Sequence, residues 1–257
     1  MDKNCYIILK GGLGNQLFMV FSALSYSIKT GQSLKIIWDL SEVKRPKYFD
    51  TILSKFRESV VEGYSGNLYR EPSFSYREIP IIDNTILCGY FQSSKYFPDI
   101  KHNILERLNL GEYPDNKYLI DNMKNKGLTP VILHVRRTDY LLLPNYHPVQ
   151  TIEYYKNAIE IVRKAVNKPY FLMISDDIDF LNTIPILDNE KIIIRENEIK
   201  TMNLMSLCRH FIIANSSYSW WGTLLGGYDI VIAPKIWFGP DGPQDWQDIY
   251  ENDWIVI

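Results

Sequence analysis

The chain has 257 residues, 46% of them hydrophobic, which suits a well-packed globular protein with one large core or two modest ones. Its net charge of −2 excludes the basic surface of a nucleic-acid-binding protein, so no nucleic-acid partner is expected. The three cysteines have no metal-ligand spacing, and no apolar run has the length of a membrane span or the pattern of a signal peptide, so we expect a cytoplasmic protein without a transmembrane segment.

The first forty residues predict a β-loop-α-β opening, as in nucleotide-binding α/β domains. The apolar strand "CYIILK" is followed by the glycine-rich turn "GGLGNQ" (11–16). Apolar residues then recur at helical spacing from Asn15 to Thr30, and residues 33–39 form the next strand.

The middle of the chain is less regular. Residues 40–85 are polar and interrupted by proline and glycine, which predicts loops and short helices. Residues 85–97 are typical of a strand and a loop, and a helix is expected from there to Leu108. The turn-rich stretch 109–118 marks a domain boundary.

The second half alternates between predicted strands and helices. The strands are expected at 130–135, 169–174, 191–195, 211–215 and 229–233, and the helices at 151–166, 178–183, 201–209 and from Tyr218. Nearly continuous apolar strands of this kind indicate a parallel sheet covered on both faces. We therefore predict an α/β protein with two Rossmann-like domains, residues 1–115 and 116–257, that face each other across a cleft.

The glycine-rich turn opens the first predicted helix, where close backbone approach and the helix N-terminus favour an anion. It is not the dinucleotide-binding fingerprint, because Leu17 stands where the third glycine is required. A tight turn without a ligand is the alternative. The two amides Asn15 and Gln16 at the helix start favour a binding role.

The stretch "HVRRTDY" (134–140) places two adjacent arginines at the end of a predicted buried strand. Guanidinium groups match phosphate oxygens in a bidentate geometry and remain charged. One of Arg136 and Arg137 is therefore predicted to face a diphosphate while the other pairs with Asp139. The alternative is a structural arginine–aspartate pair, but two guanidinium groups beside His134 exceed what one carboxylate needs.

Carboxylates follow the next predicted strand in "SDD" (175–177), where they can accept hydrogen bonds from a base or a ribose. Asp177 and Asp179 also form an Asp-x-Asp pattern that is typical of metal binding. We favour no metal, because the arginines already supply positive charge for a diphosphate. Capping of the following helix is the alternative for Asp177 or Asp179.

The stretch "NSSYSWWG" (215–222) follows another predicted strand and starts a helix. The hydroxyls of Ser216 and Ser217, together with the backbone N–H groups, predict a second anion site. Trp220 and Trp221 are expected in the core rather than as stacking platforms for a sugar.

These stretches fit a nucleotide diphosphate held without a metal, and together they resemble the α-1,2-fucosyltransferases, inverting enzymes that use GDP-fucose. The shared landmarks, in chain order, are "GGLGNQ", "GYFQS" (89–93), "HVRRTDY", "YY" (154–155), "SDD", "LMSLCRH" (204–210), "NSSYSWWG" and "APKIWF" (233–238). The stretch "HVRRTD" also resembles the core α-1,6-fucosyltransferases. The resemblance implies the GT-B fold, no metal cofactor, and acceptor binding by the first domain.

The resemblance also implies a role for each matching residue. Arg136 is expected to hold the β-phosphate and to stabilise the charge on departing GDP, with support from Arg137 through Asp139. The other donor contacts are expected from His134 and one of Asp176 and Asp177 at guanine or ribose, from Ser216 and Ser217 at phosphate oxygens, and from Asn15, next to Gly14, at the diphosphate or the fucose.

We expect an acceptor hydroxyl, the 2-OH of a galactoside, to attack the anomeric carbon of GDP-β-L-fucose with inversion. Asp139 is the first candidate for the base, His147 the second and Glu153 the third. Their alternatives are a partner for arginine, a loop residue and a charge at a helix start. The departing phosphate is a further candidate for the proton acceptor.

Two departures from the family pattern leave the substrates open. Thr138 replaces a glycine that the family usually has, and Thr201 replaces an aspartate that many members carry. Transfer of another 6-deoxyhexose, such as L-rhamnose, is one alternative function. A nucleotide-sugar-binding protein that has lost turnover is another.

Overall fold

The computed structural model describes residues 3–39 and 46–257 of the chain. The chain forms two compact units. The first comprises the chain up to Asn109 together with Asp245–Glu251, and the second comprises Leu110–Gln244 and Asn252–Ile257. The chain therefore passes from one unit to the other three times, after residues 109, 244 and 251.

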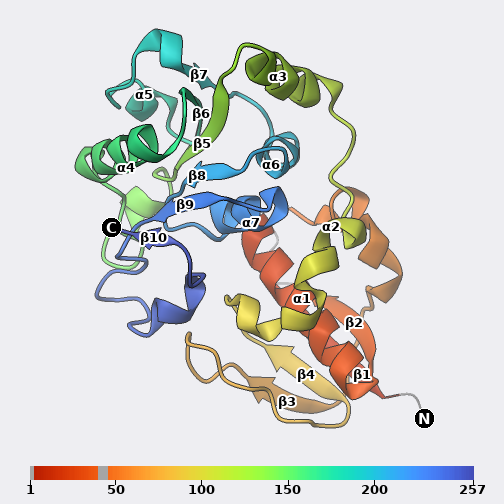
Figure 1. Cartoon of the computed structure of the whole chain (residues 1–257). Coiled ribbons are helices and arrows are strands. Elements are labelled where there is room, and N and C mark those ends of the chain that lie inside the picture. The colour runs from red at the N-terminus through yellow and green to blue at the C-terminus, as the bar shows by residue number, and fades with distance from the viewer. Residues whose placement is uncertain (1–2, 40–45) are drawn as a thin grey trace. The chain divides into compact units, whose positions relative to one another are not determined.

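The first unit contains a four-stranded sheet in the order β2-β1-β4-β3, and all its pairs are parallel. Its strands and α-helices are β1 (Asn4–Leu9), α1 (Leu13–Thr30), β2 (Ser33–Trp38), β3 (Asn67–Arg70), β4 (Thr85–Cys88) and α2 (Ile104–Arg107). Helix α1 packs along β1 (Figure 1). It ends where Gly31 adopts the left-handed conformation, at φ = 68°, which a glycine reaches without steric cost.

Strand β3 was not predicted, because three of its four residues are exposed and it carries no apolar face. It is held by backbone pairing to β4 from Asn67 to Arg70. The expected helix up to Leu108 is mostly 3-10 turn, and only α2 is α-helical.

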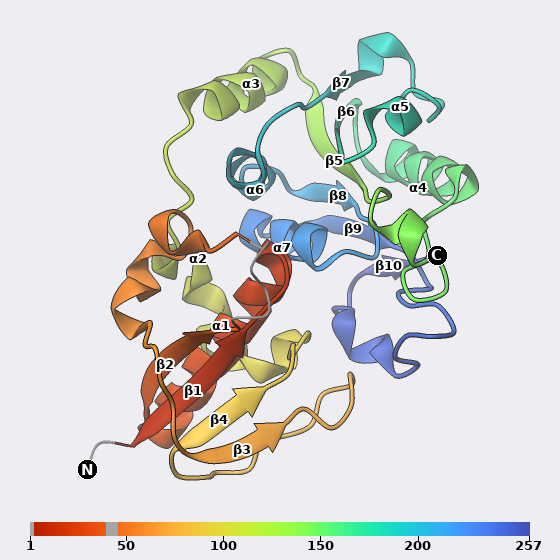
Figure 2. The same ribbon diagram turned by 180° about the vertical axis from the view of Figure 1, so that it is seen from behind.

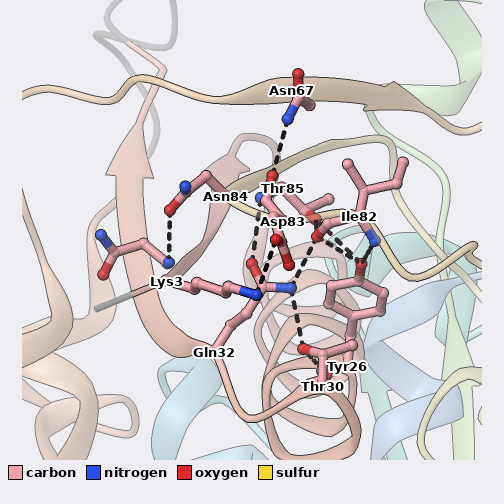
Figure 3. A network of polar contacts seen from close by, with 10 residues as sticks. Lys3, Tyr26, Thr30, Gln32, Asn67, Ile82, Asp83, Asn84 and Thr85 are labelled. Carbon is pink, nitrogen blue, oxygen red and sulfur yellow. Dashed lines mark hydrogen bonds and ion pairs between the residues drawn. The ribbon is translucent and has the colours of Figure 1, made fainter. Parts of the chain in front are cut away.

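A polar network fixes the turn that leads into β4, at the amino ends of the strands (Figure 3). The hydroxyl of Tyr26 accepts a hydrogen bond from the N–H of Ile82 (3.0 Å), and the Gln32 amide donates to the Ile82 carbonyl (2.9 Å). Lys3 and Asp83 form an ion pair at 2.8 Å. These contacts hold the amino end of the sheet, whereas the glycine-rich turn 11–16 lies at the opposite, carboxyl end.

The second unit contains a six-stranded parallel sheet in the order β10-β9-β8-β5-β6-β7. Its strands and α-helices are α3 (Pro114–Asn125), β5 (Thr129–Val135), α4 (Ile152–Ala165), β6 (Pro169–Ser175), α5 (Ile178–Leu181), β7 (Lys191–Ile193), α6 (Glu198–Ser206), β8 (His210–Ile212), α7 (Ser217–Gly226), β9 (Ile230–Ala233) and β10 (Ile255–Val256). Counted from β5, this is the strand order 3-2-1-4-5-6 of the Rossmann fold.

Helices cover both faces of this sheet, as predicted: α4 and α5 lie on one face and α3, α6 and α7 on the other (Figures 1 and 2). Val131, Leu133 and Val135 of β5 point into the core beneath α4. Trp220 and Trp221 of α7 are almost fully buried, so their predicted place in the core is confirmed. Helix α3 and strand β10 were not predicted.

No helix in the described part of the chain is both long and apolar enough to cross a membrane. Cys5, Cys88 and Cys208 are free thiols.

Candidate functional site

The loops that follow β5, β6 and β8 meet at the carboxyl edge of the second sheet. Strand β5 pairs with β6 on one side and with β8 on the other. The chain order reverses between β5 and β8, which is the switch point where α/β sheets bind ligands. Side chains from "HVRRTDY", "SDD" and "NSSYSWWG" are therefore brought to one place, as the sequence suggested.

Arg136 is held by carboxylates from two of these loops. Its Nη2 donates to Asp139 Oδ2 at 2.8 Å, and its Nε lies 3.4 Å from Asp176 Oδ2. Burial lowers the pKa of Arg136, but the two carboxylates outweigh that effect and raise it overall. The guanidinium is about one-third exposed and permanently charged.

Arg137 is held by a different pair of side chains, Asp177 and Phe180. Its Nε donates to Asp177 Oδ2 at 2.9 Å, and its guanidinium carbon lies 4.0 Å from the centre of the Phe180 ring, in cation–π contact. One of the two arginines was predicted to pair with Asp139, and that arginine is Arg136; the support by Arg137 through Asp139 that the resemblance implied is not found, because Arg137 pairs with Asp177. A guanidinium has five N–H donors, so the bonds found in the described chain leave each arginine able to donate to a ligand.

Asp176 fixes the backbone that carries both arginines. Its carboxylate accepts hydrogen bonds from the N–H groups of Arg137 (2.9 Å) and Thr138 (3.1 Å) and from the Thr138 hydroxyl. This explains why the threonine that departs from the family pattern fits here: it adds a third donor to the same carboxylate.

Asp177 caps helix α5 by accepting from the N–H of Phe180 at 3.0 Å, so the capping alternative is confirmed for this residue. That bond, followed by the ion pair with Arg137, holds the pKa of Asp177 below its usual range. Across residues 3–39 and 46–257 no group of three or more His, Cys, Asp or Glu side chains has the arrangement of a metal site.

His134 lies at the end of β5 and is almost fully buried. Burial, reinforced by the charge of Arg136, lowers its pKa to about 3, so the ring is neutral. The ring lies 5.6 Å from that of Tyr218, which links the ends of β5 and α7. A neutral imidazole offers one donor and one acceptor, as recognition of an uncharged base or ribose requires.

The three candidate bases have different surroundings. Asp139 is engaged by Arg136, which is the alternative role that the sequence left open. His147 stacks on Tyr140 at 4.5 Å between ring centres, and burial is the main reason that its pKa is lowered. Glu153 is exposed in the first turn of α4, where the helix dipole stabilises a negative charge.

The start of α7 is built on Asn215. Its amide donates to the carbonyls of Pro148 (3.0 Å) and Trp237 (2.9 Å), and it joins the loops at 148 and 237 to the end of β8. Ser216 is the N-cap residue and is buried, and Ser217 is the first residue of the helix. The ten-residue helix α7 therefore directs its positive end toward the carboxyl edge of the sheet.

In the first unit, Asn15 and Gly14 lie in the first turn of α1, at the carboxyl end of β1. Asn15 Oδ1 accepts a hydrogen bond from Gln92 Nε2 at 2.8 Å. Gln16 is fully buried and donates to the carbonyls of Gly11 (2.9 Å) and Pro46 (3.0 Å), so its amide holds the turn together.

Sequence reasoning missed Glu71, which follows β3 at the same edge. Its carboxylate accepts hydrogen bonds from the N–H groups of Tyr90 (2.7 Å) and Phe91 (3.0 Å), inside the "GYFQS" landmark. Burial raises its pKa to about 7. The nearby landmark was the available signal, because Glu71 itself lies in the polar stretch 40–85.

The sequence matches the profile of glycosyl transferase family 11 over residues 56–257. An α-1,2-colitosyltransferase of Escherichia coli is 29% identical, over 90% of this chain and 91% of its own length. The O-antigen biosynthesis glycosyltransferase WbnK of E. coli is 24% identical, over 91% of this chain and 94% of its own.

Among solved structures, the fucosyltransferase NodZ from Bradyrhizobium aligns with a TM-score of 0.55 at 17% identity, over 94% of this chain and 97% of its own. NodZ, named as an α-1,6-fucosyltransferase, has also been crystallised with GDP; that structure aligns with a TM-score of 0.55 at 17% identity, over 87% of this chain and 93% of its own. The alignment confirms the predicted GT-B-like α/β fold class.

Proposed function

The chain belongs to glycosyl transferase family 11, and from this premise we propose that it transfers L-fucose from GDP-β-L-fucose to the 2-hydroxyl of a galactoside, with inversion to an α-fucoside. The observation that carries the proposal is the pair Arg136–Arg137 at the end of β5, seated by carboxylates from two loops. The names of the relatives support a glycosyl transfer, and the NodZ complex with GDP supports the nucleotide.

The leaving group dictates what the arginines do. As the bond between the anomeric carbon and the β-phosphate oxygen breaks, negative charge grows on GDP. Arg136 presents a fixed positive charge, and its remaining N–H groups donate to the phosphate oxygens. Because Asp139 and Asp176 already orient the guanidinium, it needs little rearrangement when the charge develops.

Other residues of the second unit hold the donor. Ser216 and Ser217 bind phosphate oxygens at the positive end of α7. The neutral ring of His134 and the carboxylate of Asp176 or Asp177 face guanine or its ribose. In the first unit, Asn15 and Gly14 at the start of α1 contact the diphosphate or the fucose.

The proposed reaction uses no metal, because Arg136 and Arg137 bring two guanidinium groups to the diphosphate, each oriented by an aspartate and each with N–H groups left to donate. Arg137 also donates to the diphosphate, and its contacts with Asp177 and Phe180 orient its guanidinium. Phosphate recognition by paired guanidinium groups is strong because each group donates through parallel N–H bonds.

Colitose is a second candidate for the transferred sugar. The specific observation is the 29% identity to an α-1,2-colitosyltransferase over 90% of this chain. Colitose is a deoxy sugar like fucose, so the phosphate contacts described above serve both donors equally. The choice between them depends on contacts to the sugar ring.

A donor panel tests the proposal. The purified chain is incubated with lactose or methyl β-galactoside and with GDP-fucose, GDP-colitose, or UDP- and dTDP-linked sugars, and products are assigned by NMR. We expect an α-linked fucoside at the galactose 2-position from GDP-fucose. Faster transfer from GDP-colitose moves the assignment to the second candidate. GDP binding without turnover of either donor supports the inactive binding protein, and UDP or dTDP selectivity contradicts the proposal.

A further inference from the structure

Tyr140 connects the two elements of the second unit to which the proposed function assigns phosphate binding. It lies in the loop after β5 and is the first residue of the 3-10 turn Tyr140–Leu142. The Arg136 guanidinium lies over its ring, with 5.8 Å between the guanidinium carbon and the ring centre. Its hydroxyl donates to the backbone carbonyl of Asn215 at 2.9 Å, directly before the N-cap residue of α7. One side chain therefore reaches from the arginine to the start of the helix.

The carbonyl that receives the Tyr140 hydroxyl belongs to a residue that is fixed by its own side chain. Asn215 is almost fully buried, and its amide nitrogen donates to the carbonyls of Pro148 and Trp237. Its side-chain oxygen accepts from Gln150 Nε2 at 3.0 Å. Both polar atoms of the amide are thus engaged, so the carbonyl cannot move away from Tyr140 without disturbing three hydrogen bonds.

The ring of Tyr140 is fixed by His147. The two rings stack at 14° from parallel, with 4.5 Å between their centres. His147 also lies 5.7 Å from the Phe238 ring, and its backbone N–H donates to the Leu143 carbonyl at 2.8 Å. Burial lowers the pKa of His147, so the stacked imidazole is neutral near pH 7 and adds no charge beside Arg136.

The Tyr140 hydroxyl remains a hydrogen-bond donor at neutral pH. Burial raises its pKa above the ordinary value, whereas the charge of Arg136 and a hydrogen bond with the Ser216 side chain lower it. The protonated phenol therefore contacts both the Asn215 carbonyl and Ser216, which is the N-cap residue of α7.

Two anion-binding groups act together on one diphosphate when their separation is fixed before the ligand arrives. Asp139 and Asp176 orient the Arg136 guanidinium, and Tyr140 adds the contact that runs from that guanidinium to α7. We propose that Tyr140 is a positioning residue that sets the separation between the Arg136 guanidinium and the phosphate-binding start of α7. This inference rests on the proposed function, in which both groups bind the diphosphate of the donor.

The test compares GDP with GMP, which lacks the β-phosphate, and so separates phosphate positioning from folding. Titration calorimetry gives the affinity of wild type, Tyr140→Phe and Tyr140→Leu for each nucleotide. Tyr140→Phe keeps the ring and loses the hydrogen bond to α7, and we expect the ratio of GDP to GMP affinity to fall about two- to tenfold. Tyr140→Leu also loses the contact with Arg136, and we expect a fall of about ten- to fiftyfold.

Tyr170→Phe is the matched control. Tyr170 is the second residue of β6, and its hydroxyl donates to the Lys191 carbonyl at 2.8 Å. This variant loses a hydrogen bond from a phenol to a backbone carbonyl in the same unit, but at the amino end of the strands. We expect its free energy of unfolding to fall as it does in Tyr140→Phe, and its ratio of GDP to GMP affinity to stay at the wild-type value.

A double-mutant cycle shows whether the ring acts through Arg136. The kcat/KM for GDP-fucose is measured for Tyr140→Phe and Tyr140→Leu, each with Arg136 present and with Arg136→Ala. We expect the difference between the two Tyr140 variants to disappear once the guanidinium is removed. A defect in folding, in contrast, persists in both backgrounds.

The outcomes distinguish this inference from the proposed function. Wild type that prefers GDP to GMP, with a Tyr140→Phe variant whose affinity ratio equals that of Tyr170→Phe, overturns the positioning role and leaves the function intact. A difference between Tyr140→Phe and Tyr140→Leu that survives Arg136→Ala also overturns it. Wild type that neither binds GDP nor transfers fucose contradicts the proposed function itself, and with it the role of Tyr140.

Discussion

In both units a carboxylate at the carboxyl edge of the sheet accepts hydrogen bonds from two successive backbone N–H groups, but the charges beside the two carboxylates differ. In the first unit, Glu71 follows β3 and accepts from two successive N–H groups of the loop after the neighbouring strand β4. In the second, Asp176 follows β6 and accepts from the N–H groups of Arg137 and Thr138, in the loop after the neighbouring strand β5. Each carboxylate thus ties together the ends of two parallel strands.

The difference lies in what stands beside each carboxylate. Asp176 Oδ2 lies 3.4 Å from Nε of Arg136, so this edge collects charges of both signs. Glu71 relies on backbone N–H groups, and burial raises its pKa to about 7. One edge is therefore suited to a charged diphosphate, and the other to exchanging a proton. The following predictions test that contrast, from the largest effect to the smallest.

The arginine edge gives the largest effect. Replacing Arg136 with Ala removes a fixed donor from the developing charge on GDP, and we expect kcat to fall by roughly 10²–10³-fold, about 3–4 kcal/mol. The matched control is Arg163→Ala in α4, whose guanidinium is equally exposed and pairs with Glu160 and Glu190. The control keeps its kcat. Steady-state kinetics on both variants would show the role to be wrong if Arg136→Ala turned over like the control.

The Glu71 edge is tested by stability against pH. In the folded state the pKa of Glu71 is about 7, above its ordinary value of about 4.3. Its contribution to the free energy of unfolding is therefore fully present below that ordinary value and is lost as the pH rises through about 7. We expect the free energy of unfolding of wild type to fall by up to about 3 kcal/mol over this range, relative to Glu71→Gln.

The measurement is urea or thermal unfolding of both proteins at matched pH values between 5 and 8. The difference between the two curves isolates this one group, because all other titrating groups are shared. Parallel curves would mean that the Glu71 carboxylate titrates normally, and the contrast between the edges would lose its basis.

Asp176 in the second unit gives an intermediate effect. Asp176→Ala removes the acceptor for two backbone N–H groups and the Thr138 hydroxyl, and a hydrogen bond of this kind contributes about 0.5–1.5 kcal/mol to stability. Because Arg136 and Arg137 flank that backbone, we expect GDP affinity to fall along with stability. Titration calorimetry with GDP measures the first, and unfolding the second. Unchanged GDP affinity would show that Asp176 does not position the arginines.

Asp177 gives the smallest effect. Asp177→Asn retains an N-cap of equal quality and loses only the ion pair with Arg137, so we expect less than about 1 kcal/mol of lost stability at pH 7. The pKa of Asp177 is lowered, so its contribution is present above the ordinary value of about 3.9 and disappears as pH falls below it. Unfolding curves of the variant and wild type that stay separated in strong acid would refute this assignment.

The regular half of the fold could be predicted because its strands are continuous apolar runs. Residues such as Val131 and Phe171 have no exposed surface, and burial on both faces of a parallel sheet selects that pattern. Strand β3 could not be found this way, since it lies at the edge of its sheet with mostly exposed side chains. Its backbone pairing leaves no mark in the hydrophobic pattern.

The sequence indicated which charged residues form the site, but not which of them pair with one another. Three motifs at strand ends of the second sheet marked the arginines, the aspartates and the serines, because strand ends meet at one edge of a parallel sheet. Sequence spacing does not decide which aspartate reaches which arginine, and Asp139 paired with Arg136 rather than Arg137. Glu71 was hidden, because its partners lie 19 and 20 residues away and its burial arises only in the folded chain.

Binding of GDP in the presence of EDTA tests the central claim, that Arg136 and Arg137 supply the positive charge that a metal would otherwise provide. Titration calorimetry is carried out with wild type, Arg136→Ala and Arg163→Ala, each with and without the chelator. We expect wild type and Arg163→Ala to bind GDP equally well in both conditions, and Arg136→Ala to bind far more weakly in both. A wild-type affinity that collapses in EDTA and returns with added Mg²⁺ or Mn²⁺ would contradict the account.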